Sequence, residues 1–170
     1  MSTASAINRR GNAMLEMAMW VPLLVLLLVG MSELGRITYI YYTLQKTMYT
    51  IARYVGTQQG VNFCADSDSI VAAAKNFAIG GGTDSSTNTI LANLTADMVQ
   101  VRIERYSADT QDLGECDCSI TGCDLASGGR SPDFIVVSIP DGYSVRPTIP
   151  YLTTDPILFK PRIRLPFGGS

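Results

Sequence analysis

The four cysteines are the residues whose types and spacing most directly suggest chemistry. Cys116, Cys118 and Cys123 form a Cys-x-Cys-x4-Cys cluster, and Cys64 lies far upstream of it. Four thiolates could hold a metal ion, or the even number of cysteines could pair into two disulfides. The chain contains no histidine, which excludes Ser-His-Asp and Cys-His catalysis and removes the usual proton shuttle near neutral pH.

A single carboxylate, Glu16, lies near the start of a long apolar block. Burial of an aspartate at the centre of a membrane helix costs about 3 kcal/mol, and the cost falls towards the helix ends. Either Glu16 lies at the membrane interface near the positive helix N-terminus, or it meets a cation when subunits assemble. A cut after Gly11 would give Asn12 a free α-amino group one helical turn from Glu16, and a neighbouring subunit could offer that amine.

The apolar block predicts a membrane-spanning helix. Residues 12–32 hold no charge other than Glu16, and about 21 residues at about 1.5 Å each measure roughly 30 Å, the thickness of a hydrocarbon core. Arg9 and Arg10 lie immediately before the block, which predicts a cytoplasmic N-terminus and an exported C-terminal domain. The alternatives are a plain signal anchor and a cleaved secretory signal, although no clear small-x-small cleavage site follows the block.

Helix signals continue beyond the predicted span. Apolar residues recur at steps of three and four up to Val55, and Gly56 and Gly60 can stop a helix. We therefore predict one helix over residues 12–55, with an apolar stripe that needs partners and suits a filament core or a helical bundle. Glu33 and Arg36 are spaced to pair locally on this helix, or they could make a contact between subunits.

The pattern of this segment resembles the type IV-like prepilins. Residues 9–11 read Arg-Arg-Gly, Glu16 follows after four further residues, and the apolar run comes next. The continuation through Pro22, residues 33–36 (Glu-Leu-Gly-Arg) and residues 51–54 (Ile-Ala-Arg-Tyr) is similar to the TadE/TadG-like pseudopilins of the tight-adherence (Tad, or Flp) pilus. Prepilin peptidase cuts prepilins after the glycine, on the cytoplasmic side.

The resemblance implies a division of the chain and a function. Residues 1–11 would be a leader peptide cut between Gly11 and Asn12, residues 12–55 the transmembrane and assembly helix, and residues 56–170 the exported domain. Because the major subunits of that system are mostly little more than the helix, the resemblance implies a minor pilin that acts in pilus assembly and surface adhesion.

The same resemblance implies the protein's partners and location. The partners would be prepilin peptidase, other pilin subunits, the Tad inner-membrane assembly platform and the membrane itself. The protein would cross the inner membrane once, with its C-terminal domain in the periplasm, and could then enter an extracellular pilus. The alternative is a signal-anchored periplasmic binding domain with no pilus role.

The exported domain is predicted to mix a short helix with strands. Asp66 and Asp68 are acidic N-cap candidates for a helix that begins near residue 70 and stops at Gly80. Alternating or buried apolar residues predict strands over residues 99–104, 134–139, 143–147 and 157–165. Pro161 and Pro166 place the last one at a sheet edge. The predicted fold is α+β: a long N-terminal helix packed on a small antiparallel sheet, which the pilin resemblance also implies.

An exported location favours disulfides over a metal site, because thiols oxidise outside the cytoplasm. Cys116–Cys118 is the least favourable pair, since one intervening residue makes a strained ring. Cys64 is therefore predicted to join Cys116 or Cys118, and the remaining one of these to join Cys123.

Composition and motifs argue against other classes of protein. The chain has 13 basic and 15 acidic residues and a pI near 5.0, which disfavours nucleic-acid binding. It has no Gly-rich phosphate loop and no nucleophile elbow, so we predict no enzyme and no cofactor. Acidic pairs at residues 66 and 68 and at residues 115 and 117 could bind calcium, but no twelve-residue calcium loop is present, and a solvated acidic face is the simpler interpretation.

Overall fold

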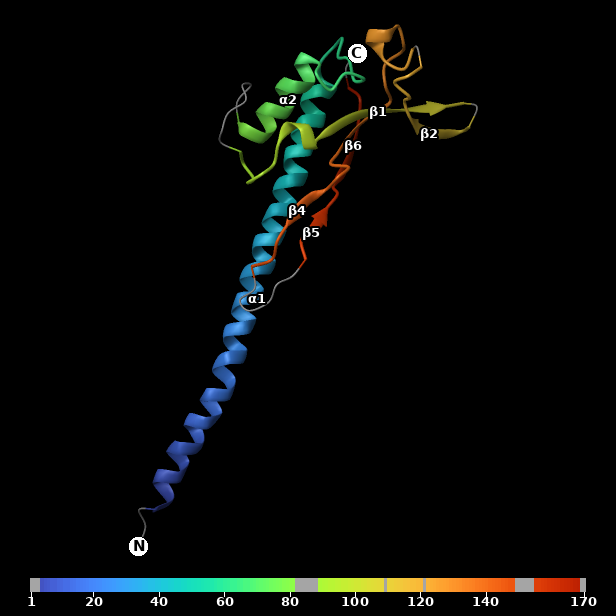
Figure 1. The fold of residues 1–170 in the computed structure, drawn as a ribbon. Helices are drawn as coiled ribbons and strands as arrows, with labels where there is room; N and C mark the ends of the chain where they lie inside the picture. Colours follow the sequence, from blue (N-terminus) through green and yellow to red (C-terminus); the bar gives the residue numbers. More distant parts are fainter. Residues whose placement is uncertain (1–3, 82–88, 109, 121, 149–154, 169–170) are drawn as a thin grey trace. The chain divides into compact units, whose positions relative to one another are not determined.

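The computed structural model describes residues 4–81, 89–108, 110–120, 122–148 and 155–168, and its fold is α+β (Figure 1). The chain divides into two compact units. The first unit is Met1–Tyr39 with Arg146–Pro156, and the second unit is Ile40–Val145 with Ile157–Ser170. Helix α1 (Ala4–Gly56) contributes its first part to the first unit and its last turns to the second.

Helix α1 contains the whole predicted helix and begins earlier than predicted. It starts at Ala4, within the predicted leader, and it continues past Pro22 to Gly56. Residues 13–56 are long and apolar enough to cross a membrane by length and composition, and none of the most apolar stretch is buried in the chain. The first unit therefore offers one candidate for a single membrane span.

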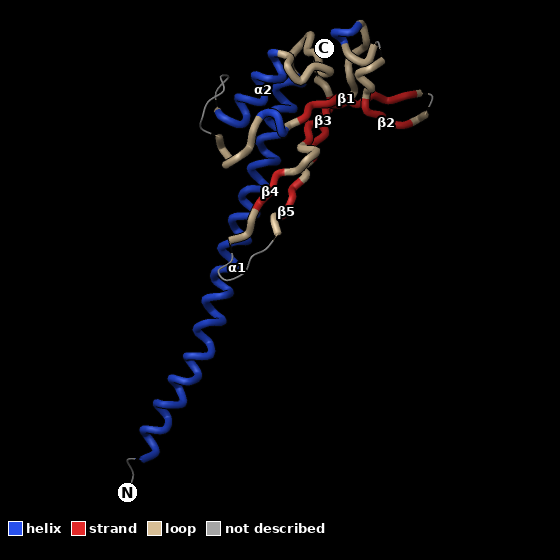
Figure 2. The backbone as a smooth tube through the Cα atoms, viewed as in Figure 1, coloured by secondary structure: helices blue, strands red, loops and turns tan. Residues whose placement is uncertain are grey.

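The second unit contains two antiparallel sheets beside the last turns of α1 (Figure 2). The larger sheet has the order β2-β1-β3-β6, and the smaller one pairs β4 with β5. The strands are β1 (Gln100–Ser107), β2 (Asp112–Glu115), β3 (Phe134–Ser138), β4 (Tyr143–Val145), β5 (Ile157–Phe159) and β6 (Arg162–Pro166). A short 3₁₀ helix, Ala96–Met98, precedes β1, and a second one, Leu125–Ser127, lies between β2 and β3.

The core of the second unit forms where one face of α1 meets the larger sheet. Leu44, Met48 and Ile51 are almost completely buried on α1, and they follow the three- and four-residue steps of one helix face. The sheet contributes alternate residues of β1 and β3, which are Val101, Ile103, Ile135 and Val137. A side chain at Gly56 would meet Ile135 at 3.3 Å, so glycine lets the end of the helix approach β3 closely.

Helix α2 (Ser69–Gly80) confirms the prediction of a short helix with an acidic N-cap. The Asp68 carboxylate accepts hydrogen bonds from the backbone N–H groups of Ile70 and Val71, which would otherwise lack partners in the first turn. The helix ends at Gly80 and is capped by Gly81, whose φ of 77° places it in the left-handed region that glycine adopts without steric cost. Val71, Ala74 and Ala78 carry its buried face.

The strand predictions are confirmed except at two places. Residues 157–165 form two strands in different sheets, because β5 ends before Pro161 and β6 starts after it. The proline has no N–H to donate to a ladder, and β6 lies at the edge of the larger sheet, as predicted. Strand β2 was not predicted, since its sequence Asp-Leu-Gly-Glu has low strand propensity.

Candidate assembly site

The predicted cleavage junction lies within α1. Gly11 is exposed, and a Cβ at this position would meet nothing within 4 Å. Asn12 continues the helical backbone, while its side chain lies outside the described residues, as do residues 1–3 of the predicted leader. The backbone at the junction is therefore helical and accessible from outside the chain.

Glu16 lies one turn after the junction and is exposed. It is not among the carboxylates that form ion pairs with described side chains. Its near neighbours Met17, Met19 and Trp20 are exposed apolar side chains. Among the described side chains, none supplies a counter-charge to this carboxylate.

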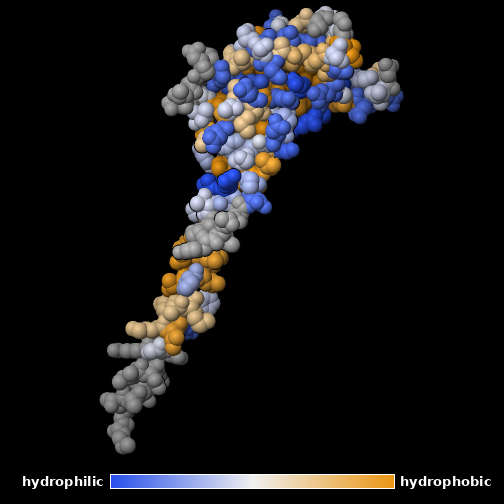
Figure 3. All heavy atoms as spheres, in the orientation of Figure 1, coloured by the Kyte–Doolittle hydropathy of each residue, from blue (hydrophilic) through white to orange (hydrophobic). Residues whose placement is uncertain are grey.

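The apolar side chains around Glu16 face outwards on every side of the helix. Between Met14 and Met31 the large apolar side chains other than the half-buried Val29 are 49% to 79% exposed, and the visible ones form a mostly orange stretch of the helix in Figure 3. A helix that is apolar all round is buried in lipid or by other proteins when it functions. The segment is therefore a surface for a membrane or for other subunits. The residues are Met14, Leu15, Met17, Met19, Trp20, Val21, Leu23, Leu24, Val25, Leu26, Leu27, Leu28 and Met31.

Glu33 and Arg36 pair locally, which is one of the two roles that their spacing allowed. Arg36 Nη2 lies 2.5 Å from Glu33 Oε1, and the same Nη2 donates to the backbone oxygen of Arg146 at 2.6 Å. The backbone N–H of Thr148 donates to Glu33 Oε1 at 2.8 Å. The pair therefore fastens residues 146–148 to the helix within the first unit, directly after the predicted span.

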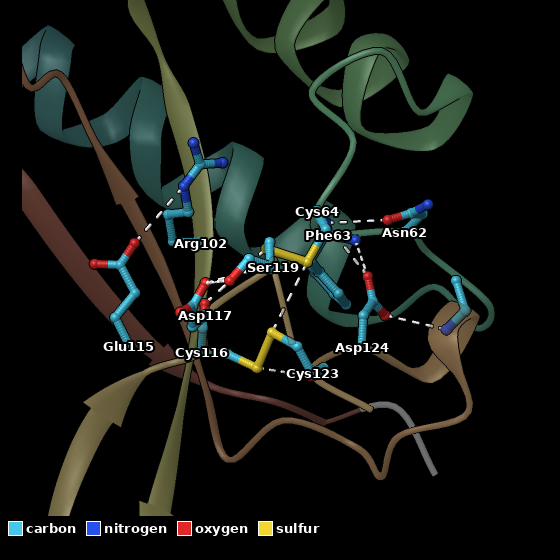
Figure 4. Close-up of a disulfide and its surroundings, with 12 residues drawn as sticks. Asn62, Phe63, Cys64, Arg102, Glu115, Cys116, Asp117, Ser119, Cys123 and Asp124 are labelled. Carbon is cyan, nitrogen blue, oxygen red and sulfur yellow. Dashed lines mark hydrogen bonds and ion pairs between the residues drawn. A yellow bond between two sulfur atoms is a disulfide. The ribbon is translucent and has the colours of Figure 1, made fainter. Parts of the chain in front are cut away.

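The four cysteines form two pairs at disulfide distance (Figure 4). Cys64 joins Cys118 with an S–S distance of 2.10 Å, and Cys116 joins Cys123 at 1.99 Å. The Cα distances of 5.4 and 5.5 Å are normal for disulfides. This is one of the two pairings that the sequence left open. The sulfurs of Cys64 and Cys123 are 3.8 Å apart, so the two bridges form one sulfur cluster.

Asp124 supports this cluster and was missed from the sequence. Its side chain is fully buried, and its carboxylate accepts hydrogen bonds from the backbone N–H groups of Phe63 and Cys64. It also accepts one from Ala126 at 3.2 Å, as the cap of a 3₁₀ turn. The only sequence signal was an aspartate two residues before Ala126, a spacing that occurs in many turns.

A second buried carboxylate, Glu104 on β1, was also missed. It forms ion pairs with Arg162 at 2.5 Å and with Arg164, and both arginines lie on β6. Strand β3 lies between β1 and β6, so the two arginines reach over β3 from the sheet edge. Two guanidinium groups compensate the burial of one carboxylate, which gives this group a structural role.

The acidic pairs considered for calcium have partners within the chain. Asp66 lies 3.6 Å from Lys75 and 3.5 Å from Arg102, which also lies 3.6 Å from Glu115. Asp117 accepts hydrogen bonds from the hydroxyl and the N–H of Ser119, and these bonds lower the pKa of its carboxyl. These contacts account for the acidic side chains by local pairing.

Three of the cysteine sulfurs, those of Cys64, Cys118 and Cys123, lie within 4.8 Å of one another. This spacing could suit a thiophilic metal ion if the sulfurs were thiolates. Each of them belongs to a pair at disulfide distance, and a disulfide sulfur is a poor metal ligand because the thiolate is the binding form.

Together these features define a class of protein: an α+β chain with a long N-terminal helix, one candidate membrane span with an exposed apolar surface, and two cysteine pairs at disulfide distance. The family model described as TadE-like protein matches residues 11–53. The match covers α1 from Gly11 almost to its end and contains no strand. Residues 11–53 are thus a TadE-like segment, which supports a structural, non-enzymatic pilin family associated with the Tad pilus. No curated protein and no solved structure matches the chain.

Proposed function

We propose that this chain is a minor pilin, or pseudopilin, of a Tad-like pilus, cut by prepilin peptidase after Gly11. The observation that carries the proposal is the TadE-like match, which begins at Gly11 and continues along the exposed apolar helix. The chain would wait in the inner membrane with its N-terminus in the cytoplasm and its C-terminal domain in the periplasm. It would then join other pilin subunits at the Tad assembly platform.

The proposed mechanism is the transfer of the helix from lipid into a protein bundle. Hydrocarbon and protein cover apolar side chains about equally well, so van der Waals packing and polar contacts between helices decide the transfer. Glu16 is the one acidic side chain of the predicted span, which holds no basic residue. Contact with the new α-amino group of a neighbouring Asn12 would neutralise it, which favours the assembled state.

The domain beyond the helix would give the subunit its particular role. In this proposal it decorates the filament, initiates it or contacts a surface, as in adhesion. The domain shares a core with the last turns of α1 and holds two cysteine pairs at disulfide distance, which suits a domain that works outside the cytoplasm.

The first test is processing in the native host. Mass spectrometry of the mature chain should find Asn12 as the first residue. The Gly11→Leu variant should remain uncut, because it places a bulky side chain at the junction. Gly30→Leu is the matched control: Gly30 lies on the same helix and has nothing within 4 Å of its would-be Cβ, so this variant should be cut normally. An uncut N-terminus in the unmodified chain would contradict the proposed processing and favour the alternative, a membrane-anchored exported domain with no pilus role.

The second test is assembly. Glu16→Ala should leave the mature chain in the membrane and lower its amount in sheared pili by about tenfold or more, the effect of about 1.4 kcal/mol per contact. Met19→Ala, which shortens an equally exposed side chain nearby, should have little effect. Normal amounts of Glu16→Ala chain in the pili would contradict the charge-pairing mechanism.

A further inference from the structure

One face of α1 in the second unit carries a shallow groove of about 490 Å³. The groove lies on the face of α1 opposite the core residues Leu44, Met48 and Ile51. All lining residues come from the end of α1 and the position after it. They are Lys46, Tyr49, Thr50, Arg53, Tyr54 and Thr57.

The groove combines cations with exposed aromatic rings. Neither Lys46 nor Arg53 is among the cations that form ion pairs with described side chains. Tyr49 and Tyr54 are both exposed, and Tyr54 stacks on the exposed Phe77 of α2 with ring centroids 6.4 Å apart. Tyrosine and arginine are the residues most enriched in the energetic centres of protein interfaces, so this groove has the composition of a docking surface.

A surface of opposite charge occurs elsewhere in the same unit. The strand β2 and the turn after it, residues 111–120, contain three exposed acidic side chains, Asp112, Glu115 and Asp117, and no basic residue. Arg102 on β1 lies 3.6 Å from Glu115 and offsets part of this charge, while Asp112 and Asp117 have no cation among their described ion pairs. Ile120 in the turn is 63% exposed. We call residues 111–120 the acidic hairpin end. In Figure 1 β2 lies away from α1, so the acidic hairpin end does not cover the groove of its own chain.

We propose that the groove on α1 binds the acidic hairpin end of a second copy of this chain. Opposite charges and exposed apolar side chains face each other in such a contact, which favours both encounter and burial. Every copy brings both surfaces, and a contact between two different surfaces is heterologous. Such contacts continue from copy to copy, into a ring or an open line of subunits. The inference rests on the proposed function and adds to it a contact between the domains of neighbouring copies of this minor subunit.

The test uses a photo-crosslinking residue in the full chain in its native host. Tyr49→p-benzoylphenylalanine puts the crosslinker in the groove, and Leu158→p-benzoylphenylalanine puts it on the exposed strand β5 as a control. The expected product joins residue 49 of one copy to residues 111–120 of another, identified by peptide mass spectrometry. A groove crosslink to a different protein, or to another part of this chain, would overturn the inference.

Charge reversal gives the second arm. Lys46→Glu with Arg53→Glu should reduce the crosslinked product by about tenfold, because like charges then face each other. Asp112→Lys with Glu115→Lys should have the same effect. A chain that carries all four substitutions should regain the product, since the charges are again opposite. Lys160→Glu, outside both surfaces, should leave the yield unchanged. Loss in each pair without recovery in the fourfold variant would overturn the inference.

The same cells separate this inference from the proposed function. Their mature N-terminus and their sheared pili are analysed beside the crosslink. Cut, piliated cells without the expected crosslink would overturn the groove contact and leave the pilin proposal intact. Uncut cells that give the crosslink would support the contact between copies and overturn the pilin proposal.

Discussion

The two halves of α1 contain similar side chains and differ in what covers them. Leu27 is 49% exposed in the first unit, while Leu44 is completely buried in the second. The same contrast holds for Met31, which is 69% exposed, and Met48, which is 1% exposed.

This difference separates two kinds of partner. Residues 40–56 find their partner in their own chain, because one helix face packs on β1 and β3. Residues 13–31 find none among the described residues of the chain, and their apolar surface needs lipid or other subunits. The stability of the second unit and the assembly of the first are therefore expected to respond to different substitutions.

The largest expected effect is the loss of the bridge between Cys64 and Cys118. These cysteines are 54 residues apart, so the Cys64→Ser/Cys118→Ser variant should lose about 4 kcal/mol of unfolding free energy in the chain-entropy model. Guanidinium unfolding of the full chain in detergent, followed by tyrosine circular dichroism, measures this loss. Membrane retention under alkaline extraction should not change, since the apolar half of α1 holds no cysteine.

The second bridge provides the control for this prediction. Cys116 and Cys123 are 7 residues apart, so the corresponding double serine variant should lose only about 2.5 kcal/mol. An equal loss for the two variants would argue against the chain-entropy explanation. Loss of membrane retention in either one would argue against the separation of the two halves.

The next largest effect comes from one substitution made in each half of α1. Leu44→Ala should destabilise the second unit by about 3 kcal/mol, because it removes a fully buried side chain from the core. Leu27→Ala makes the same chemical change at an exposed position and should cost less than about 0.5 kcal/mol. Both are measured by the same unfolding experiment. Similar losses of unfolding free energy at the two positions would show that packing on the sheet does not stabilise the second half of α1 more than the first half.

The sequence predicted best the features that depend on neighbouring residues. The apolar block, the helix beyond it and the cap of α2 at Asp68 all follow from local patterns. Strand β1 also carries its own apolar alternation, and β3 carries a continuous apolar run. Each of these elements contains within a few residues the information that defines it.

The missed features depend on residues far away in the sequence. Strand β2 forms because β1 offers it an edge, with Glu104 opposite Glu115. The buried Asp124 accepts a hydrogen bond from the backbone N–H of Cys64, 60 residues upstream. Glu104 alternates like a solvent-facing residue, and it is buried only because β6 brings two arginines over it. Local patterns contain no information about such partners.

A smaller effect is expected at Glu33, a side chain of the first unit that bonds to Arg36 and to the Thr148 amide within that unit. Glu33→Gln removes the charge that pairs with Arg36 and weakens the bond from the Thr148 amide. That amide should exchange its hydrogen faster in hydrogen-exchange mass spectrometry, while the midpoint of unfolding of the second unit stays the same. Gln45→Glu, at a half-buried site on α1 of the second unit, is the control and should leave exchange at Thr148 unchanged. Unchanged exchange in Glu33→Gln would show that the backbone holds residues 146–148 without this pair.

The smallest effect concerns Asp117, which accepts hydrogen bonds from Ser119, whereas Glu16 forms no ion pair with the described side chains. The Ser119 hydroxyl lowers the pKa of Asp117 most, and the Ser119 N–H adds to the effect, since both donate to the charged form. Its contribution to stability is therefore complete above the ordinary aspartate pKa and is lost as the pH falls through the lowered value. Ser119→Ala should raise the Asp117 pKa towards the ordinary value, which carboxyl carbon NMR measures as a titration shifted to higher pH. Thr95→Ala, far from Asp117 in the sequence, should leave that titration unchanged. An unshifted titration in Ser119→Ala would mean that the backbone N–H of Ser119 alone stabilises the Asp117 carboxylate. The Ser119 hydroxyl would then not be what separates Asp117 from Glu16.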